Sequence, residues 1–450
     1  MLTGGPVDIS ENTAATVEYR CVLVRPRSSQ LLAVEESDQH RLPRIHIPEW
    51  TRPAEELQKV IRARWELDVL VLETWAAGHD VPAFVVAELL EAEQNSFFVE
   101  FPVRQFKGSE FSEEDCQHLE SLLEGRTKIP FSRLGWIDEA MSWIESATGA
   151  SFSSKRNIAQ WNAGGGFALL STCSDDGRRY WLKATGKPNL HEFSITRLLS
   201  KSYPDFLPKL VATNTEWNAW LMEDAGAPIS DPPSAAELVP AARRMAKFQI
   251  QTTDHTVELL NTGAFDQRLS VLSDHIDAVV AYLIEAMARQ TSTKAITLSR
   301  VRLLELGEIL HQACSRLETR NIPDTLIHND LNPGNILFNG TNCVFTDWSE
   351  AAVGNPLVVC ERLCRLNPSH RESVQAAYRQ CWKNQLSNQT IEEALVWMPL
   401  LAIYAYLYGR GDWLARTEVT SPRSESSARS LARHMDRAAR EISLLEAPCH

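Results

Sequence analysis

The side chains of this chain that are best suited to chemistry lie in residues 326–350, which read LIHNDLNPGNILFNGTNCVFTDWSE. Asp330 and Asp347 supply two carboxylates, and Asn335 supplies an amide between them. Mg²⁺ prefers oxygen ligands of these kinds, and an aspartate can also orient an attacking hydroxyl and accept its proton. The three side chains therefore suit Mg²⁺-assisted phosphoryl transfer, in which a protein mainly positions the reactants and neutralises charge.

A hairpin is expected to bring these side chains close together. The Asn339-Gly340 pair is typical of a tight turn, and it separates the apolar runs 336–338 and 344–345. The turn would place the amide and both carboxylates at strand ends and in loops. The alternative is an ordinary loop in which the Asp, Asn, Pro and Gly residues only form turns.

The pattern His328-x-Asp330-x-x-x-x-Asn335, followed by Asp347 after a hairpin, resembles the catalytic loop and metal-binding aspartate of the protein-kinase-like superfamily. The run PGNIL and the pair Asp347-Trp348 resemble the aminoglycoside phosphotransferase and choline kinase branch, which phosphorylates small molecules. This resemblance implies that Asp330 is the catalytic residue, that Asn335 and Asp347 bind Mg²⁺, and that ATP is the phosphoryl donor.

Two residues of the segment depart from that branch. The branch usually has Gly after the His and often a second His two residues after the Asp, where this chain has Asn329 and Asn332. These two departures concern the loop conformation and the substrate contacts, and they leave the metal ligands unchanged.

Lys183 lies near the end of a strand-like run, YWLKA, that resembles the Val-Ala-Ile-Lys site of kinases. The resemblance implies that this lysine neutralises the phosphates of the nucleotide, with a carboxylate holding it in place. Glu192, at the start of the helical stretch 191–199, is the candidate partner. The alternatives are a surface lysine and a glutamate favoured at a helix N-terminus by the macrodipole.

Gly164, Gly165 and Gly166 separate two strand-like runs ahead of Lys183. Adjacent glycines let a backbone approach phosphate oxygens closely and expose amide donors to them. They do not spell G-x-G-x-x-G, so a glycine turn without a ligand remains the alternative.

Glu223 and Ala225 follow the apolar run 217–222. This position resembles the hinge between kinase lobes, where backbone groups meet the edge of an adenine. The resemblance therefore implies that residues 223–225 contact the base of the nucleotide.

The fold expected from the resemblance is α+β and bilobal, like a protein kinase. A small β-rich N-lobe is expected at residues 157–225, and a large helical C-lobe with the catalytic loop at residues 226–450. A separate α+β domain is expected at residues 1–125 and a connector at residues 126–156. Apolar residues at helical spacing predict helices at 55–67, 235–251, 269–289, 298–319, 391–408 and 427–445. Apolar and β-branched runs predict strands at 16–26, 30–34, 69–74, 83–90, 96–103, 158–163, 167–172 and 179–184.

The order of strands and helix in residues 1–125 resembles a Nudix fold. The catalytic helix of that family gathers metal with several carboxylates, but in the stretch IRARWELD only Glu66 would survive. One carboxylate makes a poor magnesium site. The domain is therefore expected to be non-catalytic and to serve packing, regulation or specificity.

The composition is that of a soluble globular protein of 450 residues, long enough for two or three domains. A formal net charge of −13 argues against a nucleic-acid partner and is compatible with a cationic substrate. Nine scattered cysteines without a Cys-x-x-Cys pair, and a start without a signal-peptide pattern, predict a cytoplasmic protein with reduced thiols. The longest apolar run, 396–407, is too short to cross a bilayer and predicts a buried helix.

The leading hypothesis is an ATP-dependent phosphotransferase that acts on a hydroxyl of a small molecule. Aminoglycosides, choline-like amines, amino alcohols and sugars all remain open as acceptors, and so does GTP as the donor. The alternative is a nucleotide-binding regulatory or scaffold protein with a kinase-like fold and little turnover. A protein kinase is disfavoured because Asp347 is followed by Trp348-Ser349 and no activation segment is recognisable.

Overall fold

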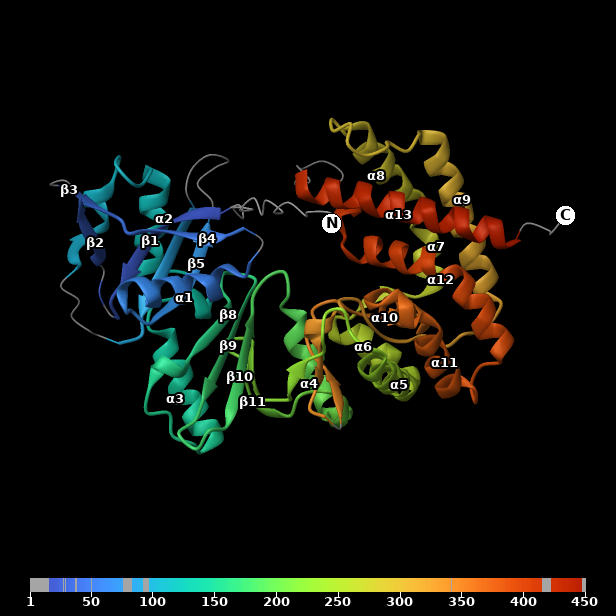
Figure 1. Cartoon of the computed structure of the whole chain (residues 1–450), viewed down its shortest axis with the longest axis horizontal. Coiled ribbons are helices and arrows are strands. Elements are labelled where there is room, and N and C mark those ends of the chain that lie inside the picture. Colours follow the sequence, from blue (N-terminus) through green and yellow to red (C-terminus); the bar gives the residue numbers. More distant parts are fainter. Residues whose placement is uncertain are drawn as a thin grey trace, which may run out of the picture. The chain divides into compact units, whose positions relative to one another are not determined.

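The computed structural model describes residues 16–446, apart from residues 27, 29, 37–38, 50, 76–82, 92–96, 341 and 415–421. The chain divides into two compact units, and it passes between them at residues 193–194, 209–210 and 224–225. The first unit holds the large sheets and the second is mainly helical (Figure 1). This composition confirms the predicted α+β class, with a β-rich part followed by a helical part.

A seven-stranded mixed sheet forms the N-terminal part of the first unit. Its main path is β3-β2-β1-β6-β5, β1 and β6 are parallel, and β4 and β7 add to β1 and β2. The strands are β1 (Thr16–Val24), β2 (Gln30–Glu36), β3 (Gln39–Arg41), β4 (Arg44–Pro48), β5 (Val69–Trp75), β6 (Ala83–Leu89) and β7 (Val99–Pro102). The predicted hairpin between residues 16–26 and 30–34 is therefore confirmed.

Two helices cover the faces of this sheet. Alternate residues of a strand point to opposite faces, so Leu23 joins the core under α1 (Pro53–Trp65) and Val22 joins the core with α2 (Glu113–Leu123). The predicted helix 55–67 corresponds to α1. Glu66, the one expected Nudix carboxylate, caps the C-terminus of α1 in the left-handed conformation, with φ of 56°.

A five-stranded antiparallel sheet completes the first unit, in the order β11-β12-β10-β9-β8. The strands are β8 (Ala159–Asn162), β9 (Phe167–Cys173), β10 (Arg179–Thr185), β11 (Leu210–Asn214) and β12 (Ala219–Glu223). Helix α3 (Trp136–Thr148) lies in the stretch predicted as a connector. One hydrophobic cluster contains Leu72 of the first sheet, Trp136 of α3 and Leu182 of the second sheet, so the three parts of this unit share a core.

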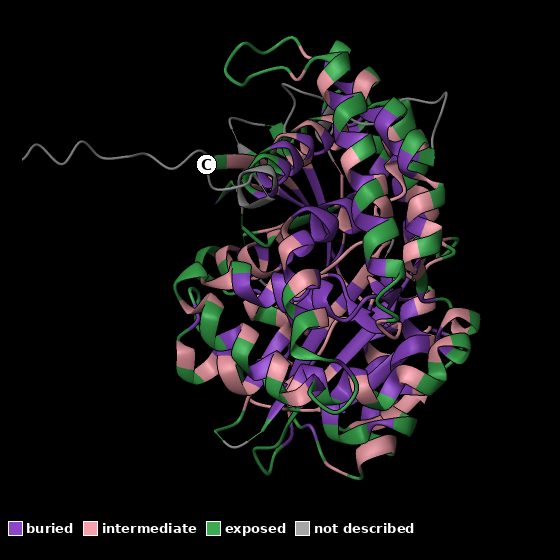
Figure 2. Ribbon diagram, turned by 90° about the vertical axis from the view of Figure 1, so that its right-hand side faces the viewer, coloured by how far each residue is buried: buried purple, intermediate pink, exposed green. Residues whose placement is uncertain are grey.

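The second unit is built from helices around a single large hydrophobic cluster, seen as the buried residues of the helices in Figure 2. It contains α5 (Ala235–Thr252), α6 (Thr256–Thr262), α7 (Leu269–Asp274), α8 (Ile276–Ala288), α9 (Arg300–Glu318), α10 (Leu357–Leu366), α11 (Arg371–Trp382), α12 (Asn388–Gly409) and α13 (Pro422–Glu446). Helix α4 (His191–Ser202) begins in the first unit and continues into the second. By length and composition alone α12 could cross a membrane, but 67% of its most apolar window is buried, as expected of a core helix.

The prediction of one continuous helix at residues 269–289 is wrong. Residues 269–289 form two helices, α7 and α8, which are separated at His275. The imidazole Nδ1 of His275 lies 2.7 Å from the carbonyl oxygen of Val271, the acceptor that a continuous helix would use for the backbone N–H of residue 275. The side chain thus takes the place of a backbone bond, and the helix is interrupted there.

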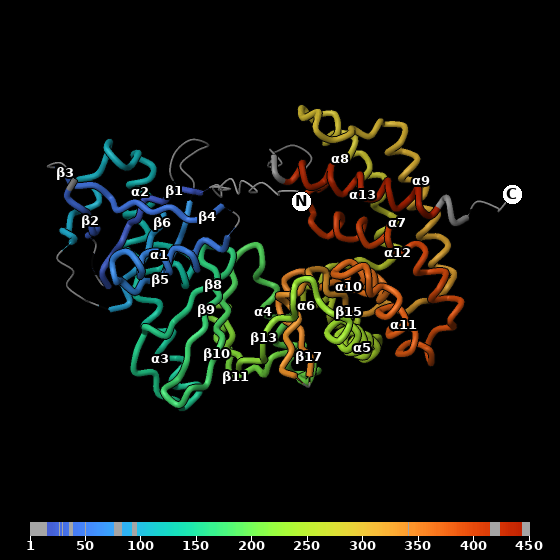
Figure 3. The backbone as a smooth tube through the Cα atoms, in the orientation of Figure 1, coloured from blue at the N-terminus to red at the C-terminus, as the bar shows by residue number. Residues whose placement is uncertain are grey.

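Two small sheets carry the loop that contains Asp330. The first, β13-β16-β17, consists of β13 (Ala227–Pro228), β16 (Ile336–Phe338) and β17 (Cys343–Phe345), visible in Figure 3 through the labels β13 and β17. The second, β14-β18-β15, consists of β14 (Phe265–Gln267), β18 (Ala351–Gly354) and β15 (Thr325–His328). The described cysteines are all free thiols.

Candidate active site

The predicted hairpin is present in the second unit. Strands β16 and β17 pair antiparallel, with Ile336 opposite Phe345 and Phe338 opposite Cys343. The Asn339 side-chain oxygen accepts a hydrogen bond from the backbone N–H of Asn342 at 2.9 Å, which closes the turn. The local Asn-Gly signal therefore gives the connection that the sequence predicts.

Asp330 and Asn335 are in direct contact. The Asn335 amide nitrogen donates to the backbone oxygen of Asp330 at 2.7 Å and to its carboxylate Oδ2 at 3.2 Å. The other carboxylate oxygen, Oδ1, accepts from the amide of Asn332 at 3.2 Å. The half-buried Asp330 carboxylate is thus oriented from both sides by neutral amides that add no counter-charge.

Asp347 is brought next to this pair by the hairpin ladder. The backbone N–H of Thr346 donates to the carbonyl oxygen of Asn335 at 3.1 Å. Asp347 directly follows Thr346, so this bond holds it close to Asn335. Asp347 has φ of 65°, in the left-handed region that aspartate adopts more readily than most residues. Its Oδ1 accepts from the Ser349 hydroxyl at 2.9 Å. The structure therefore groups Asp330, Asn335 and Asp347 in one loop system.

His328 connects the two halves of that system. Its Nε2 lies 2.9 Å from the carbonyl oxygen of Thr346, so this nitrogen must carry a hydrogen and donate. Its ring also packs against Trp348, with centroids 4.4 Å apart. Burial lowers the pKa of His328, so the imidazole is neutral and serves as a structural link between β15 and the segment that carries Asp347.

The two positions at which the chain departs from the aminoglycoside phosphotransferase branch have clear structural roles. Asn332 orients Asp330, and its own side-chain oxygen accepts from the backbone N–H of Gly334 at 2.9 Å. Asn329 is buried, and its side-chain oxygen lies 3.4 Å from the Nη2 donor of Arg362 on α10. Asparagine thus replaces the usual residues with groups that stabilise the loop.

Two further charged residues lie near Asp330. Glu350 is a carboxylate of the segment 326–350 itself, and Arg362 of α10 was not singled out by the sequence. Burial lowers the pKa of Arg362 to about 10, and Glu350 and Asp330 oppose this shift. Burial also raises the pKa of Glu350, and the charge of Asp330 adds to that rise. The Arg362 guanidinium lies 4.9 Å from the centre of the Tyr406 ring. No local sequence signal marks Arg362, because α10 reaches the loop only through tertiary packing.

In the first unit, Lys183 and Glu192 form an ion pair. The Lys183 Nζ lies 2.6 Å from the Glu192 Oε1, and the two side chains are only 5% and 1% exposed. Lys183 lies on β10, and Glu192 lies in the first turn of α4, so the predicted strand, helix and pair are all present. The Lys183 ammonium also lies 5.1 Å from the ring centre of Phe167 and 5.8 Å from that of Trp220.

The glycine turn between β8 and β9 is constrained by packing. The backbone N–H of Gly186 donates to the carbonyl oxygen of Gly166 at 2.9 Å. A Cβ on Gly186 would lie 2.1 Å from the carbonyl oxygen of Gly165, and a Cβ on Gly165 would lie 2.9 Å from Ile129 Cδ1. Gly164 has φ of 103°, whereas Gly166 faces open space. Packing therefore explains why residue 165 is a glycine, and the positive φ explains why residue 164 is one.

The predicted hinge residues lie where the chain leaves the first unit. Glu223 is the last residue of β12 and pairs with Tyr180 of β10, and at Ala225 the chain enters the second unit for the last time. Gly226 follows with φ of 107°, and a Cβ there would lie 2.5 Å from the carbonyl oxygen of Phe338. A glycine is therefore required for the close approach to β16.

The loop of the second unit offers oxygen ligands that fit Mg²⁺. Because the Asn335 amide nitrogen faces the backbone oxygen of Asp330, its amide oxygen must point away from that group. This oxygen and the Asp347 carboxylate are hard donors. The described residues contain no group of three His, Cys, Asp or Glu side chains placed for a metal. Asn335 and Asp347 could thus supply two of the oxygen ligands of Mg²⁺, with waters and phosphate oxygens as the others.

Residues 206–358 match the model of the phosphotransferase enzyme family, APH. The matched segment contains Asp330, Asn335 and Asp347, whereas Lys183, Glu192 and the glycine turn precede it. The predicted resemblance to aminoglycoside phosphotransferases is confirmed for this segment. No curated protein matches the chain.

Several solved structures are similar to the chain. A macrolide 2′-phosphotransferase from Brachybacterium faecium is 14% identical with a TM-score of 0.44, over 66% of this chain and 98% of that chain. A choline/ethanolamine kinase family protein from Mesorhizobium loti is 15% identical with a TM-score of 0.45, over 68% and 99%. A choline kinase from Cryptosporidium parvum is 14% identical with a TM-score of 0.47, over 68% and 97%.

Proposed function

Because residues 206–358 match a phosphotransferase family, we propose that this chain is a small-molecule kinase. It transfers the γ-phosphoryl group of ATP to a hydroxyl group of its acceptor. The observation that carries the proposal is the orientation of Asp330, whose carboxylate is held by two amides beside the hairpin that bears Asp347.

In this proposal each group has one task. Asp330 aligns the acceptor hydroxyl and accepts its proton as the oxygen attacks the γ-phosphorus, while the bond to the leaving oxygen of ADP breaks. Lys183, held by Glu192, neutralises phosphate charge, and the backbone at Glu223 and Ala225 contacts the base. Asn335 and Asp347 would hold Mg²⁺, which when bound supplies neutralising charge to the phosphates. Positioning and charge neutralisation supply most of the rate enhancement, because phosphoryl transfer needs little covalent chemistry from side chains.

The charges near Asp330 favour a cationic acceptor. The charges of Asp330 and Asp347 raise the pKa of Glu350, and the guanidinium groups of Arg362 and Arg410 oppose this rise. Three carboxyl groups therefore interact with two guanidinium groups here. A cation bound beside the carboxyl groups would reverse the rise in the pKa of Glu350, which its burial and Asp330 cause. Amino alcohols and aminoglycosides fit this description better than neutral sugars.

The test is a product-mass screen with the purified chain, Mg²⁺ and ATP against aminoglycosides, choline-like amines, amino alcohols and sugars. Asp330→Asn should lower turnover by about 100- to 10,000-fold, the usual contribution of a general base, while ATP affinity persists. Asp254→Asn, an exposed aspartate of the same unit, is the matched control and should leave turnover unchanged. Near-normal turnover in Asp330→Asn would refute the assignment.

A second candidate is a nucleotide-binding regulator without useful turnover. It is favoured by the hydrogen bonds that already engage both carboxylate oxygens of Asp330. The same screen separates the two functions: ATP-dependent thermal stabilisation without any phosphorylated product, across the whole panel, would support the regulator.

A further inference from the structure

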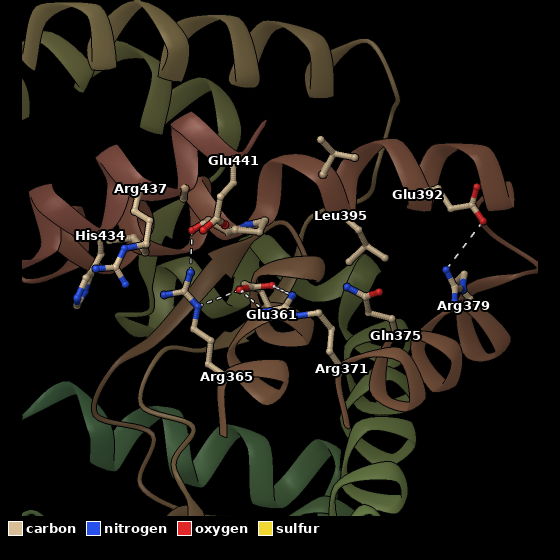
Figure 4. A pocket seen from close by; sticks show the side chains of 14 residues that line it. Glu361, Arg365, Arg371, Gln375, Arg379, Glu392, Leu395, His434, Arg437 and Glu441 are labelled. Atoms are coloured by element: carbon tan, nitrogen blue, oxygen red, sulfur yellow. Dashed lines mark hydrogen bonds and ion pairs between the residues drawn. The ribbon is translucent and has the colours of Figure 1, made fainter. Parts of the chain in front are cut away.

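Helices α10, α11, α12 and α13 of the second unit surround a hollow of about 590 Å³ (Figure 4). This volume is within the range of small-molecule sites. No lining residue comes from residues 325–354, the segment that carries Asp330 and Asp347. The hollow is therefore distinct from the loop assigned to phosphoryl transfer.

A buried carboxylate holds two arginines in the hollow. Glu361 of α10 is only 1% exposed, and it accepts from Arg365 Nε at 2.9 Å and from Arg371 Nη1 and Nη2 at 2.6 and 3.1 Å. Arg365 Nη2 also donates to the carbonyl oxygen of Pro399 on α12 at 2.7 Å. Both guanidinium groups are thus fixed in orientation before any ligand binds.

This cluster carries more positive charge than its carboxylate can balance. Two guanidinium groups share one carboxylate, so one positive charge is left over. Arg365 Nη1 and Arg371 Nε have no hydrogen-bond partner among the described residues. The side chains of Arg365 and Arg371 are 40% and 35% exposed, so their unused donors are accessible. A guanidinium has N–H groups on more than one edge, so one that already binds a carboxylate can bind a second anion bidentately.

Helix α13 adds further donors to the same hollow. His434 and Arg437 are exposed, and neither side chain makes an ion pair or hydrogen bond with any residue that the structure describes. Figure 4 shows both extending from α13 on the side of the hollow where Arg365 lies. Four arginines and three glutamates line the hollow, so its lining is net positive in a chain of net charge −13.

The other wall of the hollow is apolar. Leu395, Val396, Pro399 and Ile403 lie along one stripe of α12 and line it. Leu395 and Ile403 are only 8% and 4% exposed, whereas Val396 and Pro399 are half-buried. An inorganic anion would use only the arginines, whereas a ligand with an apolar part would also cover Val396 and Pro399 and gain by their burial. The lining therefore matches an amphipathic anion.

We propose that this hollow is a binding site for a small anionic molecule with an apolar portion, in which a phosphate or carboxylate group binds Arg365, Arg371 and Arg437. The site goes beyond the phosphoryl transfer proposed above, since its ligand does not contact Asp330. A purely structural cluster is the competing interpretation. It would explain the pair of bonds from Arg371 to Glu361, but it gives no role to the unused donors or to Arg437.

Calorimetric titration with three probes tests the proposal: phenyl phosphate, inorganic phosphate and benzyl alcohol. Phenyl phosphate should bind at one site per chain and more tightly than either other probe, because only it has both the charge and the apolar part. A repeat with benzoate separates a phosphate site from a carboxylate site. The titration is run with and without Mg²⁺ and a saturating non-hydrolysable ATP analogue, and the affinity should be the same in both.

Arg437→Ala should weaken phenyl phosphate about 5- to 10-fold through the loss of one charge-assisted contact, and Arg437→Lys should recover part of this loss. Arg440→Ala is the matched control, because Arg440 is also exposed on α13 but pairs with Asp436 and does not line the hollow. Neither change removes a partner of the buried Glu361, so folding is preserved. Phenyl phosphate binding no tighter than benzyl alcohol, displacement by the ATP analogue, or equal affinity in Arg437→Ala and wild type would each overturn the site.

Discussion

Replacing Lys183 alone should destabilise the first unit far more than replacing Lys183 and Glu192 together. The two charges are 2.6 Å apart, and their side chains are 5% and 1% exposed. Removing one partner of a buried ion pair typically costs about 3–5 kcal/mol, because the other charge stays buried without compensation. Replacing both partners by apolar residues of similar size is often neutral or stabilising by about 1–4 kcal/mol. We therefore expect Lys183→Met to lose about 3–5 kcal/mol, and the double variant Lys183→Met, Glu192→Leu to regain most of it.

Hydrogen exchange followed by mass spectrometry is the suitable assay, because a chain of two units need not unfold in a single transition. Amides of β9 and β10 report opening of the sheet that carries Lys183. Their exchange should accelerate between about 100-fold and about 4,000-fold in Lys183→Met, from the relation between free energy and equilibrium constant. Lys128→Met, at an exposed lysine of the same unit, should leave exchange unchanged.

The double variant also separates stability from function. If the pair is retained for phosphate binding, the double variant should be stable and yet bind Mg²⁺-ATP weakly by calorimetry. A double variant whose loss equals the sum of the two single losses would refute the desolvation argument. A stable double variant with unchanged ATP affinity would instead refute the phosphate-binding role of Lys183.

Four further substitutions test other parts of the structure. Asn332→Ala removes one hydrogen bond to the Asp330 carboxylate, so kcat should fall about 5-fold, for about 1 kcal/mol, with the KM for ATP unchanged in steady-state kinetics. Burial raises the pKa of Glu88 from 4.5 to about 7. Between pH 4.5 and 7 the Glu88 carboxyl group therefore keeps its proton in the folded state but loses it in the unfolded state. The free energy of unfolding should decline by about 3 kcal/mol as pH rises across this range. Thermal unfolding across this range should show the decline, and Glu88→Gln should remove it. Gly186→Ala would place a Cβ 2.1 Å from a backbone oxygen of the glycine turn and should cost about 1–3 kcal/mol by overpacking. Gly166→Ala meets nothing within 4 Å, so it should fold normally, and any loss of ATP affinity in it would mark close contact with phosphate.

Local signals predicted local structure well. The Asn339-Gly340 turn, flanked by short apolar runs, predicted the β16–β17 hairpin, because a tight turn and period-two patterning depend only on neighbouring residues. The strand that carries Lys183 and the helix that carries Glu192 were also predicted, because their patterns of apolar residues depend only on neighbouring residues. The break at His275 was missed, since apolar spacing does not reveal that a side chain will take a backbone acceptor.

The sequence by itself determined the class of fold, the order of the main elements and the loop that groups Asp330, Asn335 and Asp347. Only the tertiary structure decided that Arg362 meets Asn329, and that Glu361 orients two arginines beside α12. These contacts join segments separated in sequence, and their strength comes from burial, which no local pattern encodes. The sequence does not show whether water or another helix covers a charged residue on a helix. Burial or exposure decides whether that residue is a solvated surface group or part of a site.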